Sequence, residues 1–400
     1  MGKDENGNIL KFPSTAHPTQ VGRFLIPARL TEARLAARFT QTELAARVGV
    51  SRQAVSSYEI GDKMPEPSVL RRIAEELGQP VSFFTKAEHS SFGRRSTNFF
   101  RKKGADTKRR NQACEVYSTW FASSAHAFDH IANYPRVDLP RFEPGGAGSH
   151  GYTEEEIEMH AEDVRRHFGL GLGPISNVIR LLETKGILIC RLEITGENIE
   201  AFSYWSGERP FIFLASDKKS AVRRRFDAAH ELGHLCLHRW VGEEELDDPA
   251  RLKQIEAEAD HFAGAFLLPR KSFPNEIYTP RVEAFIDLKA RWKVAIQAMI
   301  YRCKDLGLFD ERQIVNMYKQ ISYKKWRTNE PLDSGPRAIP MEEPLLLRRV
   351  AELVFQSGRY GVDELKSDLA LSDATLEQFL GLPTGALSSQ QTDVWTPTLK

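Results

Sequence analysis

The stretch RRRFDAAHELGHLCLH, residues 223–238, contains two histidines four residues apart and a glutamate directly after the first. On a helix, His230 and His234 lie one turn apart on the same face, so both imidazoles can bind one zinc ion. Glu231 is rotated by about 100° from His230, where its carboxylate can hold a water molecule against the metal. The spacing therefore predicts zinc-assisted attack of water on a peptide carbonyl, with Glu231 as the general base and then the acid for the leaving amine.

Such a site needs a third protein ligand that leaves one coordination position open. The metzincin subclass is excluded, because its extended motif requires Gly at 237 and His at 240, where this chain has Leu237 and Trp240. The segment QIEAEADHFAGAFLLP, residues 254–269, offers Glu256 or Glu258 instead. The two point about 200° apart on one helix, so only one of them can face the metal.

The apolar stripe of this later helix favours Glu256 as the ligand, because the stripe lies on the Glu256 side. Its members are Phe262, Ala263, Phe266 and Leu267. Asp260 follows Glu256 by one turn and can hydrogen-bond the free ring nitrogen of a ligand histidine. These residues complete a gluzincin-type pattern of two histidines and one glutamate.

Three other side chains near these motifs have weaker assignments. His238 lies about 12 Å along the helix from His230, too far for one ion to bridge, so we expect it to pack beside the site. We expect His261 to be exposed. Tyr204 is a candidate donor for the oxyanion of the tetrahedral intermediate.

The N-terminal region carries the signals of short helices around a tight turn. Thr40 can cap a helix with Glu43 as its capping-box partner, and Gly49 can make the turn that follows. A next helix, 52–59, presents Arg52 and Gln53 outward, and these side chains suit guanine and adenine edges in the major groove. This arrangement predicts a helix-turn-helix.

The string QTELAARVGVSRQAVSSYEIG in this region resembles phage-repressor (XRE-type) helix-turn-helix domains over about 60 residues. The resemblance implies binding of a double-stranded DNA operator, commonly as a homodimer on paired half-sites. It places Gln41 and Ser51 near backbone phosphates. It makes Arg52, Gln53 and Ser57 the base-reading residues.

The strings RRFDAAHELGHLCLH and EAEADHFAGAFLLP resemble the ImmA/IrrE family of metallopeptidases, and the upstream GPISNVIRLLETKGI extends the likeness over roughly residues 150–275. The resemblance implies a gluzincin-type Zn²⁺ site and a protein substrate, typically a repressor. Many relatives are fused behind an XRE-type domain. Asp227 departs from the small hydroxyl residue that is commoner in the family, but it lies outside the ligand set.

The length of 400 residues predicts several domains. We expect a helix-turn-helix domain at 22–86, a basic linker at 87–112, a metallopeptidase domain at 113–275, a helical support region at 276–330 and a helical accessory region with a frayed end at 331–400. The fold class is therefore multidomain, with an all-α helix-turn-helix domain, an α+β gluzincin-like domain and a helical C-terminal region.

Several elements of the middle region are expected from apolar patterns. Helices are predicted at 113–135, 153–167 and 219–240. Strands are predicted within 186–194 and on both sides of Gly207.

Charge and composition narrow the function classes. Residues 1–115 contain 20 Lys plus Arg against 12 Asp plus Glu, which points to nucleic acid as the partner of this part. No apolar run is long enough for a membrane span, and no apolar signal segment begins the chain, so we expect a cytoplasmic protein. Four cysteines without a C-x-x-C pair argue against a disulfide framework.

The function expected from these motifs is a DNA-binding regulator with zinc endopeptidase activity that cleaves a repressor or other regulatory protein, in stress, phage or mobile-element control. One alternative is a transcriptional regulator whose zinc domain senses a ligand or metal without proteolysis. Another is an antitoxin-like repressor of its own operon.

Overall fold

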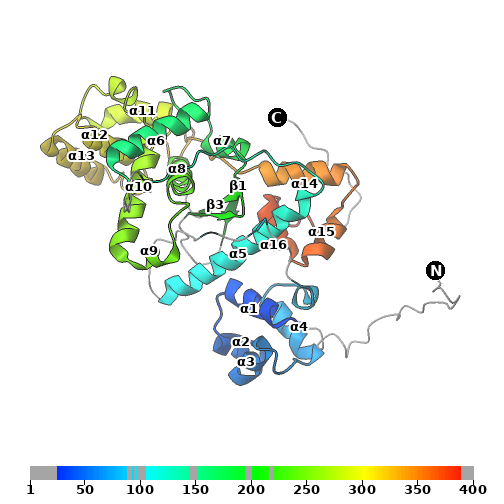
Figure 1. The fold of residues 1–400 in the computed structure, drawn as a ribbon. Coiled ribbons are helices and arrows are strands. Elements are labelled where there is room, and N and C mark those ends of the chain that lie inside the picture. Colours follow the sequence, from blue (N-terminus) through cyan, green and yellow to red (C-terminus); the bar gives the residue numbers. More distant parts are fainter. Residues whose placement is uncertain are drawn as a thin grey trace.

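The computed structural model describes residues 25–87, 92–93, 96, 105–144, 151–193, 201–215 and 220–388. Its N-terminal part is a bundle of short helices, shown in blue in Figure 1. The bundle comprises α1 (Pro27–Ala36), α2 (Gln41–Val48), α3 (Arg52–Glu59), α4 (Pro67–Glu76) and the 3-10 turn Val81–Thr85.

The local signals of this bundle form as the sequence predicts. The Thr40 hydroxyl accepts from the Glu43 N–H, and the Glu43 carboxylate accepts from the Thr40 N–H, which closes the capping box. Gly49 ends α2 in the left-handed region, with φ 72°, a conformation that favours glycine. Ser51 caps α3 by accepting from the Ala54 N–H at 3.1 Å.

The long helix α5 (Ala105–Asp129) joins this bundle to the rest of the molecule (Figure 1). It begins eight residues before the predicted start at 113, because Lys and Arg are good helix formers and a basic block does not end a helix. The Trp120 indole N–H donates to Glu32 at 3.1 Å, and the Trp120 ring meets Phe83 edge-on at 5.2 Å. The bundle is therefore packed against α5.

A three-stranded sheet lies on the other side of α5. It consists of β1 (Leu188–Leu192), β2 (Phe202–Ser206) and β3 (Arg209–Ala215), in the order β1-β3-β2. β1 runs parallel to the central β3, and β2 runs antiparallel to it. The strands confirm the prediction of one strand before and two around Gly207.

The two faces of the sheet pack against different helices. Phe202 and Tyr204 stack on β3 aromatics and share a core with α5. Ser203 and Trp205, on the opposite face, contact α8 (Ala221–Leu237). This alternation places α8, which carries both motif histidines, under β2.

Further helices complete this part of the molecule. They are α6 (Glu154–His167), α7 (Val178–Thr184), α9 (Glu243–Asp247), α10 (Pro249–Leu267), α11 (Phe285–Trp292), α12 (Ile296–Asp305) and α13 (Glu311–Tyr323). Of these, α10 packs along both α8 and α6. The helix–sheet–helix arrangement confirms the predicted α+β class.

A buried ion cluster ties α6, α10 and α12 together. The Glu158 carboxylate accepts from Arg302 Nη2 and pairs with His261 Nε2, both at 2.9 Å. Burial alone would raise the pKa of Glu158, but these hydrogen bonds outweigh it and lower the pKa to about 2. The expectation of an exposed His261 is wrong, because Glu158 on the facing helix draws the ring inward.

The C-terminal helices α14 (Leu346–Gln356), α15 (Val362–Leu369) and α16 (Asp373–Leu380) pack on α5, and α14 and α16 also reach β1. They contact the helix-turn-helix bundle as well, since Gln79 accepts from the Ser372 N–H at 3.0 Å. The predicted accessory region is thus helical and shares a core with the N-terminal bundle. The frayed end predicted for this region lies outside the described residues, which stop at 388.

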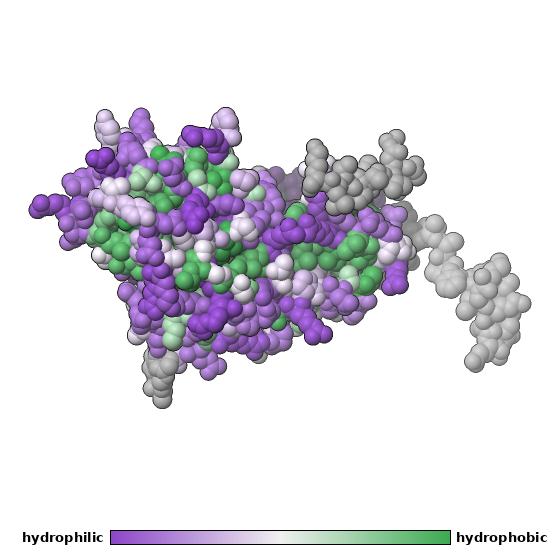
Figure 2. All heavy atoms as spheres, turned by 90° about the horizontal axis from the view of Figure 1, so that it is seen from above, coloured by the Kyte–Doolittle hydropathy of each residue, from purple (hydrophilic) through white to green (hydrophobic). Residues whose placement is uncertain are grey.

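The surface of the molecule is mixed in character. The face seen in Figure 2 alternates hydrophilic and apolar areas, and no single apolar area covers it. Among the described helices, none combines the length and apolar character that crossing a membrane requires.

Candidate metal centre

Two histidines of α8 converge on one point. His230 and His234 are buried, with exposed fractions of 1% and 2%, and their Nε2 atoms are 2.9 Å apart. They lie one helical turn apart, as the spacing predicts.

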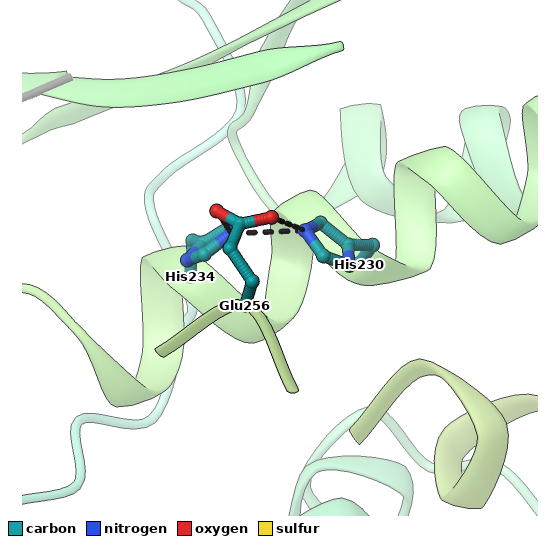
Figure 3. A group of neighbouring side chains, drawn as sticks. All are labelled: His230, His234 and Glu256. Carbon is teal, nitrogen blue, oxygen red and sulfur yellow. Dashed lines mark hydrogen bonds and ion pairs between the residues drawn. The ribbon is translucent and has the colours of Figure 1, made fainter. Parts of the chain in front are cut away.

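The third member of the group comes from α10. Glu256 Oε2 lies 3.5 Å from His230 Nε2, and Glu256 Oε1 lies 3.5 Å from His234 Nε2. Figure 3 shows the Glu256 carboxylate reaching between the two rings. One ligand atom from each of the three residues lies within 4.8 Å of the others.

These separations fit a tetrahedral zinc site. With metal–ligand bonds of about 2.1 Å, two ligand atoms of a tetrahedral ion are about 3.4 Å apart. The donor set of two imidazoles and one carboxylate also matches what catalytic zinc sites use, with a fourth position left for water or substrate. The residues present therefore fit the metal.

The outer ring nitrogens of both histidines are engaged. His230 Nδ1 is 2.7 Å from Asp260 Oδ1, the contact that the sequence suggests for this aspartate. A carboxylate partner keeps the proton on Nδ1 and directs the Nε2 lone pair toward the group. This orientation is the one that a metal ligand requires.

His238 performs the same task for His234. Its Nδ1 is 3.0 Å from His234 Nδ1, and its Nε2 is 2.9 Å from Glu258 Oε2. Burial holds the pKa of His238 at about 4, so the ring is neutral and donates its one proton to Glu258. Its Nδ1 then accepts from His234, and the His234 Nε2 lone pair also faces the group.

Glu258, the alternative ligand in the sequence, therefore binds other groups. Besides His238, it accepts from Gln254 Nε2 at 2.9 Å and from the Tyr152 N–H at 3.3 Å. Glu256 is the carboxylate that meets the two histidines.

Glu256 is held in its ionised form. Burial raises the pKa of this carboxyl, but the facing imidazoles of His230 and His234 outweigh burial and bring the pKa well below its usual range. An ionised carboxylate is the form that binds a cation.

Glu231 is buried, with an exposed fraction of 2%, and directly follows His230 on α8. Its Oε2 accepts from the Ser203 hydroxyl of β2 at 2.7 Å. Sequence reasoning missed Ser203. Strand alternation could have pointed to it, since it is the polar residue on the face of β2 that carries Trp205.

Tyr204 does not face the site, which corrects the expectation of an oxyanion donor. It is on the opposite face of β2, where its hydroxyl donates to the Ser118 carbonyl of α5 at 3.0 Å. A one-residue step along a strand turns the side chain to the other face.

Close packing of α8 on α10 sets the position of Glu256. A Cβ added at Gly233 would lie 3.1 Å from Phe262 Cδ1 and 3.4 Å from the Ala259 backbone. We expect Gly233→Val to push the helices apart, lower the free energy of unfolding by about 1–3 kcal/mol and weaken zinc binding. Urea unfolding and a zinc titration would measure both effects.

Gly264→Ala on α10 is the control, because a Cβ there meets nothing closer than 3.9 Å. Equal zinc affinity in both variants and the parent would show that this helix contact does not position Glu256.

The proposed DNA-reading residues lie on the helix-turn-helix bundle. Ser51, Arg52 and Gln53 are exposed, whereas Ser57 is half-buried. Gln41 is also half-buried, and its amide donates to Glu59 at 2.8 Å. Helices α2 and α3 lie at the end of the bundle away from the sheet (Figure 1), so the outer face of α3 is accessible.

Comparison with protein families matches both parts of the chain. Residues 182–304 match the family model of the IrrE N-terminal-like domain, Peptidase_M78, and residues 30–84 match that of a helix-turn-helix, HTH_3. The first match covers the sheet, α8 and α10. It begins 32 residues after the start of the 150–275 range of the sequence resemblance and ends beyond that range, in α12. No curated protein matches the chain. The chain therefore carries a region similar to helix-turn-helix domains, followed by a region similar to the IrrE N-terminal-like domain.

Proposed function

We propose that this protein is a zinc-dependent endopeptidase joined to an operator-binding domain, and that it controls transcription by cleaving a repressor or another regulatory protein. The observation that carries the proposal is the convergence of His230, His234 and Glu256, next to a glutamate one position after His230. In this proposal those three residues hold the metal, and Glu231 is the catalytic residue.

A zinc ion held there would act as a Lewis acid that makes water a nucleophile at neutral pH. Glu231 accepts the proton of the attacking water and then donates it to the leaving amine. The Ser203 hydroxyl binds one oxygen of the Glu231 carboxylate and so fixes its orientation. Asp260 and His238 hold the two histidines in the tautomer that binds metal.

In this proposal the DNA-binding region brings the peptidase to an operator. Arg52, Gln53 and Ser57 would read operator bases, and Gln41 and Ser51 would approach phosphates, with a homodimer covering two half-sites. Binding beside a DNA-bound substrate raises the effective concentration of the peptidase near its target. We therefore propose a DNA-bound protein as the substrate class.

Metal removal tests the proposal. The zinc-loaded chain should cleave unfolded casein, lose this activity after EDTA treatment and dialysis, and regain it with Zn²⁺ but not with Mg²⁺, which prefers oxygen ligands in octahedral geometry. Gel electrophoresis of the casein would follow the cleavage. Cleavage that persists in the metal-free protein would contradict the proposal. Zinc binding that changes operator affinity without any cleavage would favour a sensor.

A further inference from the structure

The strand β2 is an edge of the sheet, and another part of the chain covers half of its open side. The Ser96 N–H donates to the Trp205 carbonyl at 2.7 Å, and the Trp205 N–H donates to Ser96 Oγ at 2.9 Å. The Ser206 hydroxyl donates to the Gly93 carbonyl at 3.0 Å. Phe92, Gly93 and Ser96, here called the edge segment, thus mimic an added strand.

The edge segment is closely fitted to β2 and its turn. A Cβ at Gly207 would lie 2.4 Å from the Phe92 carbonyl oxygen, and one at Gly93 would lie 3.1 Å from Gly207 Cα. The Phe92 ring packs against His126 at 5.0 Å and Phe211 at 5.8 Å. The edge segment therefore packs closely against β2, its turn and α5.

The same edge passes the candidate catalytic group. Trp205 directs its backbone N–H and C=O outward to Ser96, so Ser203, two residues earlier, directs its backbone groups to the same side. Within the described part of the chain, no backbone partner is found for the Ser203 N–H and C=O. The Ser203 side chain binds Glu231. A peptide paired with the outer edge of β2 would therefore pass beside Glu231.

We propose that the edge segment inhibits the peptidase by occupying the outer edge of β2 at Trp205, the edge on which an extended peptide substrate would add as a strand. The proposal rests on the proposed function for its substrate. A substrate that replaced Ser96 would gain the two backbone hydrogen bonds at Trp205, each contributing about 1 kcal/mol. The tethered segment competes at a high effective concentration and suppresses that gain.

The position of the edge segment in the chain suggests how the inhibition would be regulated. It lies between the last turn of the helix-turn-helix bundle, which ends at Thr85, and the start of α5 at Ala105. The edge segment is thus connected in sequence to both the DNA-binding bundle and α5. Control of substrate access by operator binding through this connection is part of the proposal.

Ser96→Pro tests the inhibition, because proline lacks the N–H that donates to the Trp205 carbonyl. The test uses the full zinc-loaded chain with Glu231→Gln, so that the probe, fluorescein-labelled unfolded casein, binds without being cleaved. We expect its Kd by fluorescence anisotropy to fall about three- to tenfold relative to the same chain with Ser96 intact. Hydrogen exchange of the Trp205 amide should accelerate, and Gly93→Val should give the same two changes.

Ala87→Pro is the matched control, a proline in the same connection at an exposed residue outside the edge segment. It should change neither the Kd nor the exchange at Trp205. Unchanged exchange at Trp205 in Ser96→Pro, or faster exchange with unchanged casein binding, would overturn the inhibition. With Glu231 restored, tighter binding without cleavage would refute the peptidase and leave the edge assignment intact.

Discussion

Glu231→Gln should abolish cleavage and leave the metal in place. The amide cannot accept the proton of the attacking water, and loss of a general base typically lowers the rate about 100- to 10,000-fold. The Ser203 hydroxyl can still donate to the amide oxygen, so the local geometry around the 2.7 Å contact is retained. The fall should appear in kcat on unfolded casein, with zinc content unchanged by metal analysis.

Asp227→Asn is the matched control for this prediction. It makes the same carboxylate-to-amide change on the same helix, at a half-buried residue one turn before Glu231 and outside the ligand group. Its activity should stay close to that of the parent. A Glu231→Gln protein that retained zinc and cleaved casein at the parental rate would exclude Glu231 as the general base.

The second large effect is expected in DNA recognition. Replacing Arg52 and Gln53 together by alanine removes two exposed side chains at the start of α3 that suit guanine and adenine edges. Each such contact discriminates against the wrong base by about 1–3 kcal/mol, so the double variant should lose about tenfold or more of its preference for a selected site over random DNA. Selection from a random DNA pool followed by mobility-shift titration would measure this preference.

Arg71→Ala provides the comparison for this prediction. Arg71 is exposed on α4, so its loss removes a positive charge without touching α3. Arg71→Ala should weaken binding to all sequences alike, if at all, and keep the preference. Undiminished site preference in the Arg52→Ala, Gln53→Ala variant would refute base reading by these residues.

Local sequence signals predicted much of the fold. The capping box of Thr40 and Glu43, the turn at Gly49 and the cap at Ser51 each depend on residues within three positions of one another, and the structure has all of them. The position of Glu256 beside the two α8 histidines could also be predicted, because the apolar stripe of α10 indicates which side faces α8.

Contacts between residues far apart in the sequence could not be predicted from local signals. His261 was expected to be exposed, but its partner Glu158 lies 103 residues away on α6. Tyr204 is a candidate oxyanion donor by sequence, but the register of β2 turns Ser203 toward Glu231 instead. Helix periodicity gives the face of a side chain, whereas only tertiary packing shows what that face meets.

The packing of the helix-turn-helix bundle on α5 and on the C-terminal helices was likewise unexpected. A basic, polar sequence between two regions is typical of a solvated linker, and the sequence contains no sign that Gln79 will meet Ser372. The bundle also shares a hydrophobic core with α5 and the C-terminal helices.

Zinc content tests the central claim most directly. Metal analysis by mass spectrometry should find about one zinc per chain in the parent protein and almost none in Glu256→Ala. Glu258→Ala should still hold about one zinc at saturating metal, with affinity reduced about 10- to 100-fold, because Glu258 acts only through His238. Circular dichroism would establish that both variants are folded. Full zinc content in Glu256→Ala, or its complete loss in Glu258→Ala alone, would contradict the proposed metal centre.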